Sequence, residues 1–139
     1  DLNSEGLLLL TNDGEMANRL THPRYGVSKT YRVLVAGNPT REVLNQLRRG
    51  VYLAEGVARI TGVTIKRRYK KSTVLEMVLQ EGRNREIRRS LARVGHKVMR
   101  LGRIATGPIR LGNLAPGEYR PLSSTEVHQL TRWAGGGKR

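Results

Sequence analysis

The stretch DLNSEGLLLLTNDGE, residues 1–15, decides how the rest of the chain is interpreted. An acid and several turn formers lead into four leucines at residues 7–10, and a second polar turn ends the run. Four apolar residues between turn formers predict a strand buried on both faces. Asp1 would then lie on a loop that enters the core, where a carboxylate can be held rigidly. On composition alone, an acid at this position is more often a solvated chain end.

The charge balance points to a polyanionic partner. Lys and Arg number 26 against 11 Asp and Glu, so the 139 residues carry a formal net charge of +15. RNA or DNA fits such an excess best. An anionic membrane is disfavoured because no predicted helix is basic on one face and bulky-apolar on the other. No apolar run is long enough to span a bilayer.

Two residue types are missing, and each absence excludes a class of site. There is no Cys, which excludes disulfides and thiolate metal sites and is typical of a cytoplasmic protein. There is no Phe, and aromatic residues make up only 4% of the chain. A broad aromatic platform for stacking single-stranded bases is therefore disfavoured.

Strands alternate with helices along the chain, without an internal repeat. Tyr31, Val33 and Val35 share one face of a predicted strand, and residues 73–79 show the same period of two. Ser123 and Glu126 form a capping box for a final helix, with Val127 and Leu130 directed inward. Further helices are predicted over residues 14–21 and 40–49. The alternation predicts an α+β or α/β domain with one sheet, spanning residues 1–133 and followed by a flexible basic tail, residues 134–139.

The segment EGRNREIRR, residues 81–89, is the second informative stretch. It predicts the end of a strand at Gly82 and then a helix as far as Val94, with Ile87 and Leu91 on its buried face. Arg88 lies about 100° around the helix from Ile87. At such a flank, a long cationic stem covers apolar surface while its head group points into a cleft. Arg85, Arg89 and Arg93, spaced four apart, are predicted on the opposite face.

Basic residues also gather at the run KRRYKK, residues 66–71, and on a predicted strand over residues 98–104. The run is predicted to form a hairpin tip or loop. A solvated surface and a contact with an RNA backbone explain it equally well.

Three motifs, in order, resemble those of the RsuA/RluB-type ribosomal RNA pseudouridine synthases. The first is residues 1–15, where the family's catalytic aspartate falls on Asp1. The family has Gly-Arg-Leu before this acid. The second is residues 29–33, KTYRV. In the family, the tyrosine of this motif stacks on the target base, and it falls here on Tyr31. The third is residues 82–89. In this motif the basic partner of the acid falls on Arg88, and Arg89 is kept as the alternative.

The resemblance implies a single pseudouridine-synthase-like α+β domain, incomplete at its N-terminus. Its sheet would be mixed and mostly antiparallel, with helices packed against it and an RNA-binding cleft. The implied reaction converts a uridine of ribosomal RNA, of the large subunit, to pseudouridine without a metal or other cofactor. We expect a cytoplasmic monomer. The expected RNA-binding residues are Lys29, Arg83, Asn84, Arg85, Arg89, Arg100 and Arg103.

A non-catalytic, basic RNA-binding or ribosome-assembly module is the competing hypothesis, because the net charge supports it equally well. The order of Asp1, Tyr31 and Arg88 in matching motifs favours the enzyme. Convergence of the three side chains on one cleft would discriminate between them. A DNA-binding regulator is disfavoured because no helix-turn-helix spacing stands out.

Overall fold

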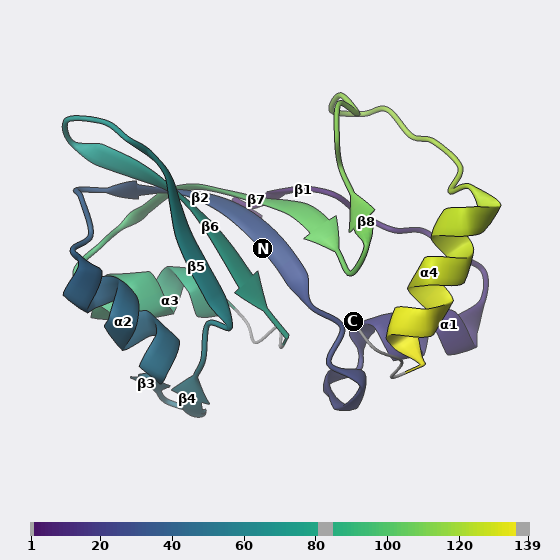
Figure 1. Cartoon of the computed structure of the whole chain (residues 1–139), viewed down its shortest axis with the longest axis horizontal. Coiled ribbons are helices and arrows are strands. Elements are labelled where there is room, and N and C mark those ends of the chain that lie inside the picture. Colours follow the sequence, from purple (N-terminus) through teal and green to yellow (C-terminus); the bar gives the residue numbers. More distant parts are fainter. Residues whose placement is uncertain (1, 81–84, 136–139) are drawn as a thin grey trace.

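A six-stranded sheet forms the centre of the computed structural model, which describes residues 2–80 and 85–135 (Figure 1). The strand order is β1–β7–β2–β6–β5, with β8 beside β7. The pair β1–β7 is parallel and the other pairs are antiparallel. The expected α+β fold with a mixed, mostly antiparallel sheet is confirmed. The strands of this sheet are β1 (Glu5–Gly6), β2 (Lys29–Ala36), β5 (Gly62–Arg68), β6 (Ser72–Leu79), β7 (Val98–Thr106) and β8 (Ile109–Arg110).

The predicted helices form, and their caps explain where they begin. Asp13 and Ser123 each accept a hydrogen bond from a backbone N–H of the first turn, and Glu126 completes the capping box at Ser123. Thr40 caps its helix in the same way. The helices are α1 (Gly14–Thr21), the 3₁₀ turn η1 (Pro23–Tyr25), α2 (Arg41–Arg49), α3 (Glu86–Arg93) and α4 (Ser124–Ala134). A two-stranded hairpin, β3 (Val51–Leu53) and β4 (Gly56–Ala58), lies beside α3.

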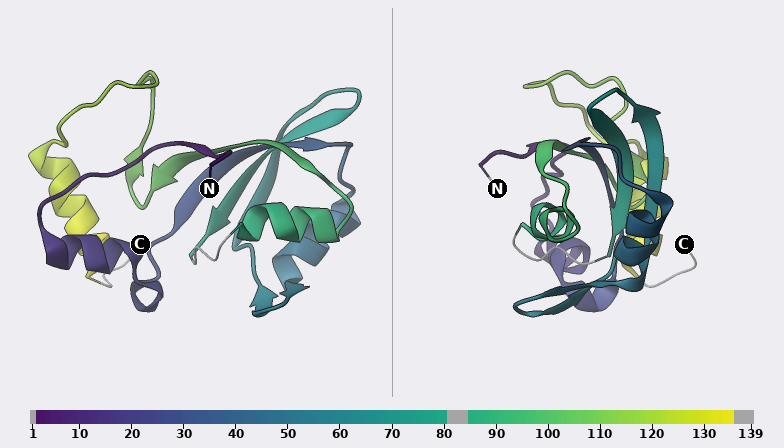
Figure 2. Two further views of the ribbon diagram at one scale, coloured as in Figure 1. Left: turned by 180° about the vertical axis from the view of Figure 1, so that it is seen from behind. Right: turned by 90° about the vertical axis from the view of Figure 1, so that its left-hand side faces the viewer.

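Apolar side chains gather in two separate clusters. The larger one contains Val33 of β2, Leu75 of β6 and the buried faces of α2 and α3. The smaller one joins Leu20 of α1 to Leu130 of α4 and to Ile109 of β8. Figure 2 shows the corresponding arrangement, with α2 and α3 at one end of the sheet and α1 and α4 at the other. The long strands β2 and β7 connect the two ends.

Strand alternation decides which side chains face the helices. Tyr31, Val33 and Val35 belong to or pack against the larger cluster, together with Leu75 and Met77 from the neighbouring strand. Intervening β2 residues such as Arg32 and Leu34 therefore project to the other face of the sheet. This part of the sequence prediction is confirmed.

The predicted buried strand at residues 7–10 is wrong. Strand β1 comprises only Glu5 and Gly6, and beyond it only Leu7 is buried, whereas Leu8 is 69% and Leu10 85% exposed. The reason is competition for an edge. Strand β8 pairs with β7 at Ala105 and Thr106, directly beyond the β1 pairing, so the leucine segment has no further ladder to join.

Two smaller predictions also need correction. Val127 is 46% exposed rather than inward, while Leu130 and Ala134 are the buried residues of α4. Helix α4 therefore extends one residue into the stretch expected to be a tail, whose residues 136–139 lie outside the described part. Strand β6 ends at Leu79, in agreement with the strand pattern of residues 73–79, and the expected strand end at Gly82 lies outside the described residues. Over residues 2–80 and 85–135, no helix is long and apolar enough to cross a bilayer.

Candidate active site

The segment that follows Asp1 is fixed against β7 by hydrogen bonds in both directions. The Leu7 N–H donates to the Arg103 carbonyl at 2.8 Å, and Arg103 Nε donates to the Leu7 carbonyl at 2.9 Å. Gly6 makes this approach possible. Its φ is +115°, and a Cβ at this position would lie 2.3 Å from the Arg103 carbonyl oxygen. The first motif therefore depends on a glycine for its contact with the sheet.

Asp1 itself lies outside the described residues, but the chain two positions later does not. Arg88 on α3 donates from Nη2 to the backbone carbonyl of Asn3 at 2.9 Å. Arg88 is partly buried, as expected for a residue at the flank of the helix. The structure therefore brings the third motif into direct contact with the first.

Tyr31, from the second motif, lies on β2 on the helix-covered side of the sheet. It is partly buried and packs against the larger apolar cluster, to which α3 contributes Ile87 and Leu91. Its register partners are Met77 on β6 and Arg103 on β7. Tyr31 and α3 thus share one side of the sheet and one core.

Lys29 lies two residues before Tyr31 and so projects to the same face of β2. Burial lowers the pKa of its amino group, and the positive charge of Arg103 lowers it further. A lysine in this setting holds its proton less firmly than one at an open surface.

Helix α3 begins without a side-chain cap and is fixed in place by other contacts. Arg85 occupies its N-cap position with φ 52°. Arg89 forms a bidentate ion pair with Glu55 in the β3–β4 turn, with Nη1–Oε1 at 2.6 Å and Nη2–Oε2 at 2.7 Å. This hydrogen bonding raises the pKa of Arg89 above its ordinary value. Of the three arginines expected on the outer face, Arg93 is exposed, whereas Arg89 contacts the hairpin.

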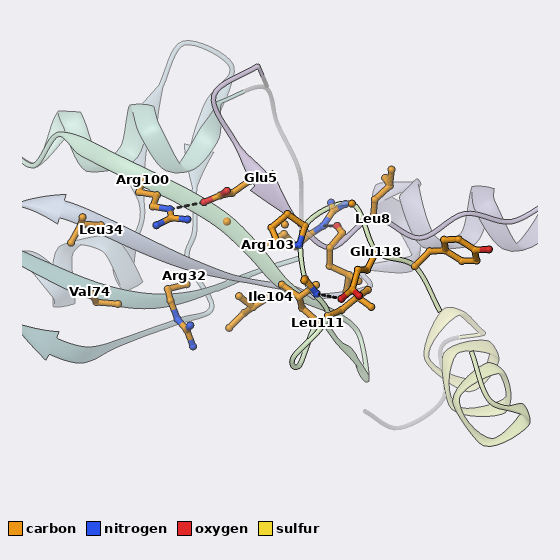
Figure 3. Close-up of a pocket in the computed structure, with 18 of the residues that line it drawn as sticks. Glu5, Leu8, Arg32, Leu34, Val74, Arg100, Arg103, Ile104, Leu111 and Glu118 are labelled. Atoms are coloured by element: carbon orange, nitrogen blue, oxygen red, sulfur yellow. Dashed lines mark hydrogen bonds and ion pairs between the residues drawn. The ribbon is translucent and has the colours of Figure 1, made fainter. Parts of the chain in front are cut away.

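Arg100 lies on the opposite face of the sheet, beside a groove of about 980 Å³ (Figure 3). Its register partner is Leu34, and its Nε donates to Glu5, which raises the pKa of Arg100. The groove is lined by Arg32 and by side chains that are mainly apolar, including Leu8, Leu34, Val74, Ile104 and Leu111. The structure therefore separates Arg100 from the face that carries Tyr31.

The basic run at residues 66–71 forms the end of β5 and the tip of the β5–β6 hairpin, in agreement with the predicted hairpin tip or loop. The Arg67 guanidinium lies 5.0 Å from the centre of the Tyr69 ring, and Lys70 and Lys71 are exposed. Backbone contacts hold the tip, since the Gly37 N–H donates to the Lys71 carbonyl at 2.7 Å. Arg83 and Asn84 lie outside the described residues.

Sequence reasoning missed the partners of these arginines. Glu55 and Glu5 lie 34 and 95 residues from Arg89 and Arg100. No local pattern marks either acid, because Glu5 reaches Arg100 through the pairing of β1 with β7, and Glu55 reaches Arg89 through packing of the β3–β4 hairpin beside α3. Within residues 2–80 and 85–135 there is no group of three or more His, Asp or Glu placed to hold a metal ion.

Comparison with known proteins decides the family. Residues 1–93 match the family model described as RNA pseudouridylate synthase. The chain belongs to this family. A solved structure titled as a crystal structure of pseudouridylate synthase superimposes with a TM-score of 0.82 at 29% identity, covering 94% of this chain and 56% of that one. The pseudouridylate synthase fold expected from the three motifs is thereby confirmed.

Two curated relatives in the pseudouridylate synthase family are considerably longer than this chain. An uncharacterized RNA pseudouridine synthase of Aquifex aeolicus is 47% identical over 135 residues, which are 97% of this chain and 54% of the relative. Ribosomal large subunit pseudouridine synthase B of Bacillus subtilis is 40% identical over 141 residues, with coverage of 99% and 57%. The chain spans about half the length of these relatives.

Proposed function

We propose that this chain is the catalytic part of an enzyme that converts a uridine of large-subunit ribosomal RNA to pseudouridine. Family membership supports the reaction. The likeness to the Bacillus subtilis large-subunit synthase supports the substrate. The net charge of +15 is consistent with binding to a polyanion.

Three residues carry the proposed chemistry. The target nucleotide leaves its stack at a cost of a few kcal/mol, so that its sugar is exposed. The ionised carboxylate of Asp1 then either attacks C1′ of the ribose or removes the C2′ proton. The bond from C1′ to N1 breaks, the base turns, and a bond from C1′ to C5 forms. The C5 proton is lost and N1 gains one, so the isomer has the same atoms and no net redox change occurs. Tyr31 offers a ring face to the turned base.

The hydrogen bond from Arg88 to the Asn3 carbonyl is the observation that carries this proposal. It places a guanidinium beside the backbone two residues from Asp1. A cation at hydrogen-bonding distance favours the ionised form of a carboxyl group, which either mechanism requires. The same contact supports Arg88, rather than its neighbour, as the partner of the acid.

The proposal includes contacts with the RNA backbone. The candidates are exposed or partly buried cations around the first and third motifs, the hairpin tip at residues 66–71, and the two residues outside the described part. Arg89 and Arg100 already hold carboxylates, which a phosphate would have to displace. Besides residues 66–71, the candidates are Lys29, Arg83, Asn84, Arg85, Arg89, Arg100 and Arg103. We further propose that the enzyme acts in the cytoplasm as a monomer without a cofactor.

The deciding experiment is Asp1→Asn in the natural full-length protein, with pseudouridine mapped by mass in ribosomal RNA from cells that carry either form. Pseudouridine should disappear at one site while RNA binding survives. Asp13→Asn is the matched control, because Asn caps a helix as well as Asp does. If the Asp1→Asn protein still forms pseudouridine, Asp1 is not the catalytic acid. A wild-type protein that binds ribosomal RNA but leaves every uridine unchanged would establish the non-catalytic module instead.

A further inference from the structure

We propose that Glu55 is a positioning residue, which sets the rotation of α3 through Arg89 and so directs Arg88 toward the first motif. This inference rests on the function proposed above. The ion pair joins the turn between β3 and β4 to the middle of α3 through both terminal nitrogens of Arg89. A bidentate pair fixes the angle of the side chain as well as its distance.

The two arginines are adjacent in α3, so their directions around the helix axis differ by about 100°. Fixing Arg89 on Glu55 therefore fixes where Arg88 points. In the structure, Arg88 reaches the Asn3 carbonyl while Arg89 holds the hairpin. The two contacts lie on different sides of one short helix and constrain its rotation together.

Helix α3 is short, so a directional contact can set its rotation. It has eight residues, no side-chain hydrogen bond at its N-cap, and Ile87 and Leu91 as its buried apolar side chains. Apolar packing is not directional and tolerates small rotations. At the outer radius of a helix, about 5–6 Å, a rotation of about 10° moves a side chain by about 1 Å. A displacement of about 1 Å at a catalytic group can lower a rate by about 100-fold.

For Arg89, the positioning role is an alternative to the phosphate contact proposed above, and the test decides between the two. A phosphate ligand would act through RNA affinity and would not require Glu55. A positioning pair would act on the rate of the bound complex, and both partners would be needed equally. A measurement of RNA affinity therefore reports the phosphate contact, and a measurement of the single-turnover rate reports the positioning role.

The test uses the natural full-length protein and five variants: Glu55→Ala, Arg89→Ala, the exchange Glu55→Arg with Arg89→Glu, Arg88→Ala as a reference for loss of the partner of the acid, and Arg120→Ala as control. Arg120 forms an equally bidentate pair with Glu126 on α4, in a part of the molecule without a proposed catalytic residue. Each variant is measured for single-turnover pseudouridine formation at saturating RNA, for RNA affinity and for its unfolding midpoint.

Both alanine variants should lose about 10- to 100-fold in rate, with RNA affinity changed by less than about threefold. The exchange should recover a substantial part of the rate, and Arg120→Ala should keep the wild-type rate and RNA affinity. If the pair only stabilised the fold, the unfolding midpoint of the alanine variants would fall while their single-turnover rate at saturating RNA stayed at the wild-type value, and this result would overturn the inference. Weaker RNA binding in Arg89→Ala but not in Glu55→Ala would overturn the inference in favour of a phosphate contact.

The failure of this inference can be distinguished from failure of the proposed function. If the wild type forms pseudouridine and Arg88→Ala does not, unchanged rates in both Glu55→Ala and Arg89→Ala overturn the positioning role alone. If the wild type forms none, the proposed function falls first. If Glu55→Ala fails to fold, the variant with Glu55→Arg and Arg89→Glu decides. If that variant folds but does not form pseudouridine, the inference is contradicted.

Discussion

Arg88 donates a hydrogen bond to the carbonyl of Asn3, a residue 85 positions earlier in the chain. This contact joins a helix of the third motif to the segment that begins with Asp1. A guanidinium can hold a backbone carbonyl with one nitrogen and a carboxylate with others, which a single ammonium group does poorly. The geometry therefore explains why an arginine, rather than any cation, suits this position.

Arg88→Lys should lower the single-turnover rate by about 10- to 100-fold, because a charge-assisted hydrogen bond contributes about 1.5–3 kcal/mol. RNA affinity should change little, since the total charge is kept. Rate measurements at saturating RNA, with filter binding beside them, check both statements. An unaltered rate would show that positive charge alone suffices.

Gly6→Ala should destabilise the protein and displace the first motif. The added Cβ would meet the backbone of Arg103 at 2.3 Å, at a φ that other residues rarely adopt. We expect a loss of about 2 kcal/mol or more in the free energy of unfolding, together with loss of activity. Gly14→Ala is the control, because nothing lies within 4 Å of a Cβ there and alanine favours the first turn of α1. Urea denaturation of both variants decides, and equal midpoints would contradict the prediction.

Neutralising the hairpin tip should flatten the salt dependence of RNA binding. The triple change Arg67→Gln, Lys70→Gln and Lys71→Gln removes three exposed charges. The slope of log affinity against log salt should fall by about 2, because each phosphate of a single strand that a cation neutralises adds about 0.7 to it. The same changes at Arg41, Arg49 and Arg132, exposed on α2 and α4, provide a control of equal charge. Equal effects of both triples would indicate attraction by net charge without a specific contact.

The pH dependence of stability should carry a contribution from Glu126. Hydrogen bonds from Arg120 and from the Ser123 backbone lower the pKa of this carboxyl group from 4.5 to about 2. A carboxyl group whose pKa is lower in the folded than in the unfolded chain stabilises the folded state, and this contribution is complete at any pH above the pKa of the unfolded chain. The contribution should therefore be complete above pH 4.5 and be lost as the pH falls through about 2. Thermal unfolding from about pH 6 to about pH 2 should show a smaller decline for Glu126→Gln than for the wild type.

The sequence predicted local structure well where the pattern came from short-range physics. The caps at Asp13 and Ser123 and the alternation around Val33 are confirmed because each depends on residues a few positions apart. The leucine run failed because its environment depends on which strand occupies the edge of β7. The ion pair of Arg89 with Glu55 was missed for the same reason, since it depends on tertiary packing.

The family motifs predicted more of the candidate site than composition did. They placed Arg88 on the segment that the structure brings to Asn3. They did not indicate that Arg100 would lie across the sheet from Tyr31, because a strand presents its residues to both faces and the register decides which. The roles of Asp1, Tyr31 and Arg88 in catalysis stay predictions.

The parallel pairing of β1 with β7 also has a consequence for biosynthesis. Asp1 leaves the ribosome about 100 residues before Arg103, the residue that holds Gly6 and Leu7 in place. At about 5–20 residues per second, the first motif waits for several seconds without its anchor. A nascent chain that stalls before β7 therefore exposes its leucines without the strand that anchors them, and the contact between the first motif and the sheet forms only after most of the described residues have been synthesised.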